Sequence, residues 1–117
     1  MSQQERWQVS GNAAEAYERY LVPTLFTPWA HDLIARAALQ PGERVLDVAC
    51  GTGIVARLAA AHVGVAGHVV GVDLNPDMLA IARAQPPATA SARVEWREGD
   101  ANALPCNDAT FDAVFCH

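Results

Sequence analysis

A glycine-rich turn between two apolar segments is the feature that most restricts how this chain can fold. Residues 45–59, VLDVACGTGIVARLA, begin with a valine-rich run and continue, after Gly51 and Gly53, into a run rich in alanine and leucine. The first composition favours a β-strand and the second a helix, so the glycines mark a turn between them. Gly51, Gly53 and Ala56 also fit the pattern G-x-G-x-x-G/A of nucleotide-binding turns.

The rest of the chain continues this alternation of strand and helix. The helix after the turn is expected over residues 53–63, and a second helix over residues 76–84 follows the capping pair Asn75 and Pro76. The strand before the turn is expected over residues 44–49, and further strands at residues 67–73, 93–100 and 111–117. This alternation predicts an α/β fold with a parallel sheet, in which right-handed crossovers place helices on both faces.

The N-terminal residues precede this alternation and carry helical patterns. Residues 12–21 are rich in helix formers, and residues 22–28, VPTLFTP, are expected to interrupt them. Thr27, followed by proline, is expected to cap a second helix. In that helix Trp29, Leu33 and Ala37 recur at helical spacing.

Composition and charge narrow the classes of function. The chain is 51% hydrophobic and 18% charged, with a formal net charge of −5, which is typical of a globular protein. The acidic balance disfavours a nucleic-acid partner, because surfaces that bind phosphates are usually basic. The apolar residues 54–72 are interrupted by glycine, arginine and histidine, so we expect no membrane span.

The cysteines and histidines do not have the spacing of a metal site. Cys50, Cys106 and Cys116 lie far apart, and the four histidines are equally scattered. We therefore expect no bound metal, and thiols that stay reduced in the cytoplasm.

Two acidic residues at strand ends indicate which nucleotide the turn binds. Asp73 lies 22 residues after Gly51, where a carboxylate that accepts hydrogen bonds from ribose hydroxyls is expected. Asp47 lies just before the turn, where a carboxylate would repel the pyrophosphate of a dinucleotide. S-adenosylmethionine has no phosphate and carries two cationic groups, so Asp47 favours this ligand. Asp47 also fits a second role, accepting hydrogen bonds from backbone amides of the turn, and the two roles are compatible.

Three motifs resemble, in order, those of class I S-adenosylmethionine-dependent methyltransferases. VLDVACGTG is similar to the first motif of that family, and VVGVDLNPDML to the acidic segment that follows it. EGDANALPCNDATFDAVFCH resembles the segment that holds the adenine-binding acid and the fourth strand. The resemblance covers residues 43–117, and the nearest subgroup is the small-molecule methyltransferases of ubiquinone and menaquinone biosynthesis.

The resemblance implies cofactor contacts for nine residues. Asp73 would hold the ribose hydroxyls, Leu74 and Met78 would pack against the adenine, and Asp100 and the Ala101 N–H would bind its edge. Met78 fits the helix core equally well. The four residues expected around the methionine end of the cofactor are Asp47, Ala49, Gly51 and Gly53.

The resemblance also implies an architecture, a Rossmann-like three-layer sandwich. The family sheet has seven strands, and the first four have the spatial order 3-2-1-4, so we expect a truncated sheet of that order with N-terminal helices. Residues 1–40 would form a helical cap or lid, and residues 41–117 the cofactor-binding half. The fourth strand would lie at a sheet edge, and its apolar side chains predict a homodimer through that strand.

The expected function is methyl transfer from S-adenosylmethionine to a small-molecule acceptor. Two alternatives stay open: an NAD(P)-dependent oxidoreductase, which the glycine turn and Asp73 also fit, and a non-catalytic cofactor-binding or self-associating module. The acceptor-binding segments of the family follow the fourth strand, so we expect negligible methyl transfer from residues 1–117 alone. The sequence does not assign the acceptor, its reacting atom or the catalytic base.

Overall fold

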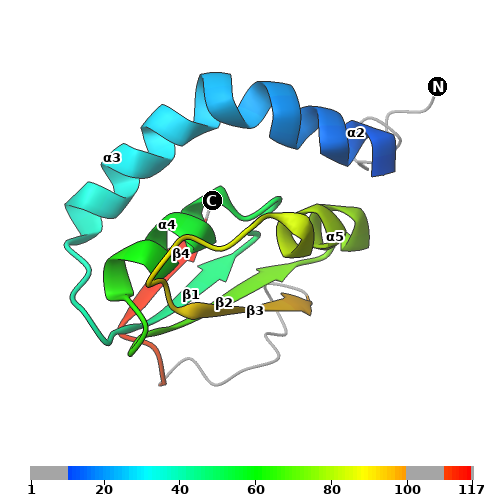
Figure 1. Ribbon diagram of the computed structural model, residues 1–117. Helices are drawn as coiled ribbons and strands as arrows, with labels where there is room; N and C mark the ends of the chain where they lie inside the picture. The colour runs from blue at the N-terminus through cyan, green and yellow to red at the C-terminus, as the bar shows by residue number, and fades with distance from the viewer. Residues whose placement is uncertain (1–10, 100–109, 117) are drawn as a thin grey trace.

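The computed structural model describes residues 11–99 and 110–116, and its centre is a four-stranded parallel sheet (Figure 1). The strands are β1 (Arg44–Val48), β2 (His68–Asp73), β3 (Arg93–Glu98) and β4 (Ala113–Cys116). Their order is β3-β2-β1-β4, as expected from the family resemblance. Each strand lies within the range that the sequence predicts.

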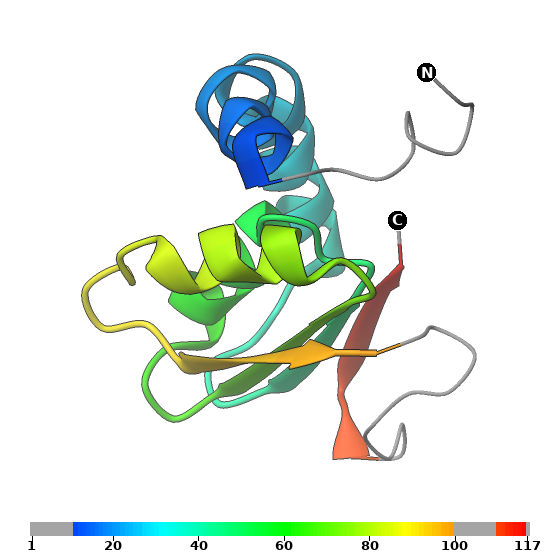
Figure 2. The same cartoon turned by 90° about the vertical axis from the view of Figure 1, so that its right-hand side faces the viewer.

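Two helices connect the first three strands and lie on the same face of the sheet (Figures 1 and 2). Helix α4 (Ile54–Val63) leads from β1 to β2, and α5 (Pro76–Ala84) leads from β2 to β3. Both crossovers step in the same direction across the sheet, and right-handed connections then place both helices on one side. Helices on both faces were expected, but in the described residues they cover only this one.

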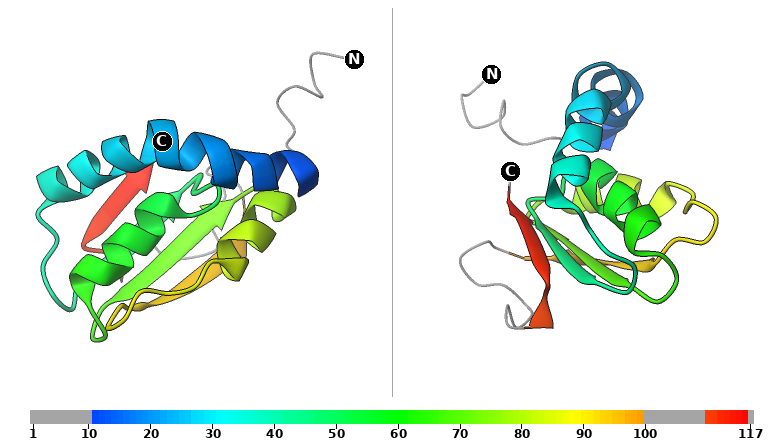
Figure 3. Two further views of the ribbon diagram at one scale, coloured as in Figure 1. Left: turned by 45° about the horizontal axis from the view of Figure 1, so that its top comes forward. Right: turned by 90° about the vertical axis from the view of Figure 1, so that its left-hand side faces the viewer.

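An N-terminal helical segment lies across α4 and α5 (Figures 2 and 3). It consists of α2 (Gly11–Ala16), the π-helix η1 (Tyr17–Phe26) and α3 (Thr27–Ala37). The sheet, the pair α4 and α5, and this segment form three layers. The parallel sheet of order 3-2-1-4 with its crossover helices confirms the predicted Rossmann-like three-layer α/β class, although in the described residues all helices lie on one side of the sheet.

The predicted interruption at residues 22–28 is wrong, because η1 runs directly into α3 (Figure 3). The π-helical winding accommodates Pro23, which lies inside η1. Thr27 is not an N-cap: its backbone N–H and its hydroxyl both donate to the carbonyl of Val22, the hydroxyl at 2.9 Å. These bonds continue the helix through the segment that was expected to break it.

The buried face of α3 packs against α4. Ala30 and Ile34 are fully buried and belong to one hydrophobic core with Val55 and Ala59 of α4. Trp29 is 43% exposed. Leu33 is partly buried against the same core, so the core-facing side of α3 includes Ala30, Leu33 and Ile34.

The register places four residues in one row across the sheet. Asp47 pairs with Phe115 on one side and with Gly71 on the other, and Gly71 pairs with Trp96. A Cβ atom added at Gly71 would lie 2.7 Å from both Cε3 and Cζ3 of Trp96. Gly71 thus leaves the space that the indole ring occupies.

Replacing Gly71 by alanine should therefore destabilise the protein through its contact with Trp96. Overpacking of this kind costs about 1–3 kcal/mol of unfolding free energy. The penalty should largely disappear in a Trp96→Leu background, because the smaller side chain vacates the space. Urea unfolding of the four proteins of this double-mutant cycle measures the coupling. An equal penalty for Gly71→Ala in both backgrounds would show that the indole ring is not the obstacle.

Candidate functional site

The glycine turn, residues 49–53, joins the end of β1 to the start of α4. Ala49, Gly51 and Gly53 have positive φ angles of 59°, 58° and 91°. Glycine adopts such angles readily because it has no Cβ, whereas alanine does so at a cost of about 1–2 kcal/mol. The alternation of left-handed residues folds the backbone tightly at the carboxyl end of β1.

Asp73 connects the glycine turn to the residues that follow β2. The Gly51 N–H donates to Oδ2 of Asp73 at 2.8 Å, and the Asn75 N–H donates to Oδ1 at 2.8 Å. For Asp73 the sequence offers a ribose-binding role and, as the alternative, a helix-capping or loop role; these two hydrogen bonds show a structural role in the loops. A carboxylate offers about four acceptor positions, so the half-buried Asp73 keeps capacity for two ribose hydroxyls.

Backbone amides of the turn donate within the protein. Besides the bond from Gly51 to Asp73, the Cys50 N–H donates to the Val72 carbonyl at 2.9 Å and the Gly53 N–H to the Cys50 carbonyl at 3.0 Å. A turn that binds pyrophosphate presents its amides to the phosphate oxygens. These three amides are committed elsewhere, so the turn suits a ligand without phosphate.

Two carboxylates make the end of β1 electrostatically negative. Asp47 is fully buried. Cys50 is also buried, and its thiol interacts electrostatically with both Asp47 and Asp73. Burial raises the pKa of the Cys50 thiol far above its ordinary value, and the charges of Asp47 and Asp73 raise this pKa further. The thiol is therefore neutral at physiological pH, and the local field favours a cationic ligand group.

The residues expected near the adenine differ in accessibility. Leu74, next to Asp73, is 64% exposed and can pack against a ligand. Met78 is 8% exposed and lies in the core side of α5, in line with the helix-core alternative. Asp100 and Ala101 lie outside the described residues.

The start of α5 next to Asp73 is fixed as predicted. Oδ1 of Asn75 accepts hydrogen bonds from the N–H groups of Asp77 at 2.9 Å and Met78 at 3.4 Å. Such a cap satisfies amides that the first turn of a helix leaves without partners. The connection that carries Asp73 and Leu74 is thus held at both ends.

Packing inside the protein requires a glycine at position 53. It is buried, and a Cβ atom there would lie 2.9 Å from Cζ3 of Trp96, closer still to its Cη2, and 3.3 Å from Nη1 of Arg57. We expected the absence of a side chain at both Gly51 and Gly53 to admit a ligand. At Gly53 the space is filled by the protein itself, and sequence analysis gave no role to Trp96 or Arg57.

A cavity of about 410 Å³ lies beside the turn, between α4, α5, β3 and the connection from α5 to β3. Arg57 and Trp96 contribute to its wall, but none of the nine predicted cofactor residues does. The cavity is therefore adjacent to the predicted site and separate from it. Within residues 11–99 and 110–116, no three histidine, cysteine or acidic side chains are grouped to hold a metal, and no helix is long and apolar enough to cross a membrane.

Similarity to known proteins shows to which family the chain belongs. Residues 45–117 match the family model described as a methyltransferase domain. The chain belongs to the class I S-adenosylmethionine-dependent methyltransferases. The family resemblance drawn from the three motifs is confirmed, and S-adenosyl-L-methionine is the cofactor of the family.

Two curated methyltransferases illustrate the relationship. The 2-phytyl-1,4-naphtoquinone methyltransferase of Synechococcus elongatus is 42% identical over 87 residues, which cover 74% of this chain and 37% of that protein. The arsenite methyltransferase of Halobacterium salinarum is 42% identical over 80 residues, which cover 68% of this chain and 20% of that protein. The methyltransferase segment described here thus corresponds to little more than a third of the first relative and a fifth of the second.

A solved structure supports the same fold. Phosphoethanolamine N-methyltransferase 2 of Haemonchus contortus, in complex with S-adenosyl-L-methionine, superposes with a TM-score of 0.72 at 27% sequence identity. The alignment covers 94% of this chain and 26% of that one. The similarity includes the N-terminal part of this methyltransferase chain as well as its sheet.

The raised pKa of Cys50 predicts that its thiol, in the glycine turn, reacts slowly with thiol reagents. A Cys106→Ser, Cys116→Ser protein leaves only Cys50, and a Cys50→Ser, Cys106→Ser protein leaves only the exposed Cys116. At pH 8, below the raised pKa, Cys50 is protonated, so it should react with a disulfide reagent at least about tenfold more slowly than Cys116. In urea the two rates should converge. Equal rates in the native proteins would contradict the burial of the thiol.

Proposed function

We propose that this chain forms the cofactor-binding part of an S-adenosylmethionine-dependent methyltransferase that acts on a small molecule. The observation that carries the proposal is the hydrogen bond from the Gly51 N–H to Asp73. It commits the Gly51 amide to a carboxylate of the protein, so this amide is not available to a phosphate of a dinucleotide. The buried Asp47 adds a second negative charge on the same side.

The residues present fit this cofactor. Asp73 has acceptor capacity left for ribose hydroxyls, and the exposed Leu74 next to it offers an apolar surface to a purine. The charges of Asp47 and Asp73 favour the ammonium and sulfonium groups. We assign the same roles to Ala49, Gly51 and Gly53 as in the sequence analysis, with Gly53 acting through the packing of the turn.

The protein's contribution to the reaction is positioning. When bound, S-adenosylmethionine would supply a methyl group that its sulfonium activates for transfer to the acceptor. The glycine turn would hold the methionine end of the cofactor and Asp73 its ribose, which would fix the direction of the methyl group. The N-terminal residues 1–40 form a cap or lid in this proposal, which the position of the described helical segment, residues 11–37, across α4 and α5 supports (Figure 3).

The class of acceptor follows from the named relatives. One acts on a phytylnaphthoquinone and another on arsenite, so we propose a small acceptor and would test quinols first. The dinucleotide alternative has lost its basis, because the committed amides of the turn and the family match both favour the methyl donor. We also propose a cytoplasmic location, in keeping with the free thiols of Cys50 and Cys116.

Binding of S-adenosylhomocysteine, the product form of the cofactor, tests the proposal. In calorimetry it should bind the chain, whereas NAD and NADP should not. Asp73→Asn should weaken this binding by about 1.5–3 kcal/mol, the range for hydrogen bonds to a charged group. Preferential binding of NAD would contradict the proposed function.

A matched control separates the ligand role of Asp73 from a general charge effect. Asp77→Asn removes an equal charge from the first turn of α5 and should change the affinity by less than about 0.5 kcal/mol. If both variants lose the same affinity, Asp73 has no specific contact with the ribose.

We further propose that the chain forms a homodimer through β4. In the described sheet β4 pairs only with β1, and Val114 in it is 54% exposed. Exposed apolar edge strands recruit other strands, and a two-fold contact satisfies both edges.

Sedimentation at micromolar concentration should therefore show a dimer that Val114→Lys converts to a monomer. Val65→Lys changes an equally apolar, 78% exposed residue in the connection from α4 to β2 and should leave the dimer intact. A wild-type chain that sediments as a monomer would refute this assembly.

A further inference from the structure

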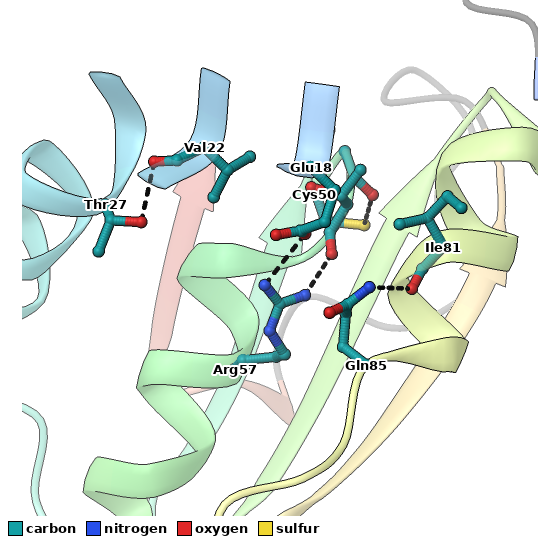
Figure 4. A network of polar contacts seen from close by, with 9 residues as sticks. Glu18, Val22, Thr27, Cys50, Arg57, Ile81 and Gln85 are labelled. Carbon is teal, nitrogen blue, oxygen red and sulfur yellow. Dashed lines mark hydrogen bonds and ion pairs between the residues drawn. The ribbon is translucent and has the colours of Figure 1, made fainter. Parts of the chain in front are cut away.

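The side chain of Arg57 joins the glycine turn to the N-terminal helical segment (Figure 4). It extends from the first turn of α4, where Nη1 donates to the carbonyl of Thr52 in the glycine turn. Its Nη2 donates to Oε1 of Glu18 in η1 at 3.2 Å, across 39 residues of sequence. One guanidinium group therefore contacts two parts of the chain that are remote in sequence.

This ion pair differs from a surface pair by its burial. The side chains of Arg57 and Glu18 are 20% and 17% exposed, whereas those of Arg36 and Asp32, paired along α3, are 78% and 62% exposed. Exposed pairs contribute little because water screens them, but a largely buried charge needs its partner. The rigid guanidinium fork can also hold two acceptors in a fixed relation, which a lysine ammonium cannot do equally well.

The bond to Thr52 fixes one particular peptide group. The Thr52 carbonyl and the Gly53 N–H belong to the same peptide, and that N–H donates to the Cys50 carbonyl at 3.0 Å. Arg57 therefore holds one side of the peptide and the backbone holds the other. Glycine tolerates many backbone angles, so it restricts the rotation of an adjoining peptide group only weakly. A contact from outside the turn is therefore needed to fix the peptide group between Thr52 and Gly53. Trp96, packed against Gly53, supports the same peptide group from the sheet.

We propose that Arg57 is a positioning residue for cofactor binding, which couples the docking of the N-terminal helical segment, through Glu18, to the shape of the glycine turn. This inference rests on the proposed function of the turn as the cofactor site. Coupling of this kind is reciprocal: a cofactor that selects this shape of the turn also favours the docked helix.

The first test measures the turn without any ligand. In Arg57→Gln, hydrogen exchange of the Gly53 amide, followed by NMR, should accelerate at least tenfold, because the peptide loses one of its two contacts. Arg36→Gln removes the equivalent charge from the exposed pair and should leave this rate unchanged. An unchanged Gly53 rate in a folded Arg57→Gln protein overturns the inference, whatever the cofactor may be.

The second test measures the coupling with S-adenosylhomocysteine. Its affinity should fall at least tenfold in Arg57→Gln and less in Arg57→Lys, and Asp32→Asn should stay within twofold of wild type. Binding should slow hydrogen exchange of the amides of residues 17–26 in wild type and in Asp32→Asn, but not in Glu18→Gln. Glu18→Gln keeps the arginine, so it remains informative if Arg57→Gln does not fold.

The outcomes separate the two proposals. Wild-type affinity in Arg57→Gln, or ligand-induced protection of residues 17–26 in Glu18→Gln, would refute the coupling while leaving the cofactor site intact. Failure of the wild-type chain to bind S-adenosylhomocysteine would refute the proposed function, and the Gly53 exchange rate would then decide the role of Arg57 alone.

Discussion

The hydrogen bond between the Gly51 N–H and the Asp73 carboxylate is the contact on which the site depends. It joins the ends of two neighbouring parallel strands, and the second oxygen of the same carboxylate holds the start of the connection to α5. One side chain thus sets the separation of the two connections at the carboxyl edge of the sheet. This edge is where open α/β sheets bind their ligands, so the contact that shapes the fold also shapes the site.

The elements that the sequence predicted correctly are those encoded locally. Alternating strand and helix patterns predicted all four strands, α4 and α5, and the Asn75 cap followed from residue type and position alone. Asp73 was found because a fixed spacing from the glycines reflects the length of one strand–helix–strand unit. The spatial order of the strands came instead from the family resemblance.

The remaining features depend on contacts between distant segments, which periodicity does not encode. Glu18 meets Arg57 only once the N-terminal helices lie across α4, and nothing near either residue specifies this pairing. Likewise, Pro23 reads locally as a helix breaker, but π-helical winding and the bonds from Thr27 carry the helix past it. The packing role of Gly53 was missed because its neighbour, Trp96, comes from a different strand.

Gly71 and Trp96 show how such packing constrains change over evolution. Each residue alone is unremarkable in a strand, but the indole ring occupies the volume that a side chain at position 71 would need. A larger residue at position 71 is acceptable only after position 96 has become smaller, and a smaller residue at 96 leaves a void until 71 grows. The two positions therefore show epistasis, and homologous chains that differ at one of them are expected to differ at both.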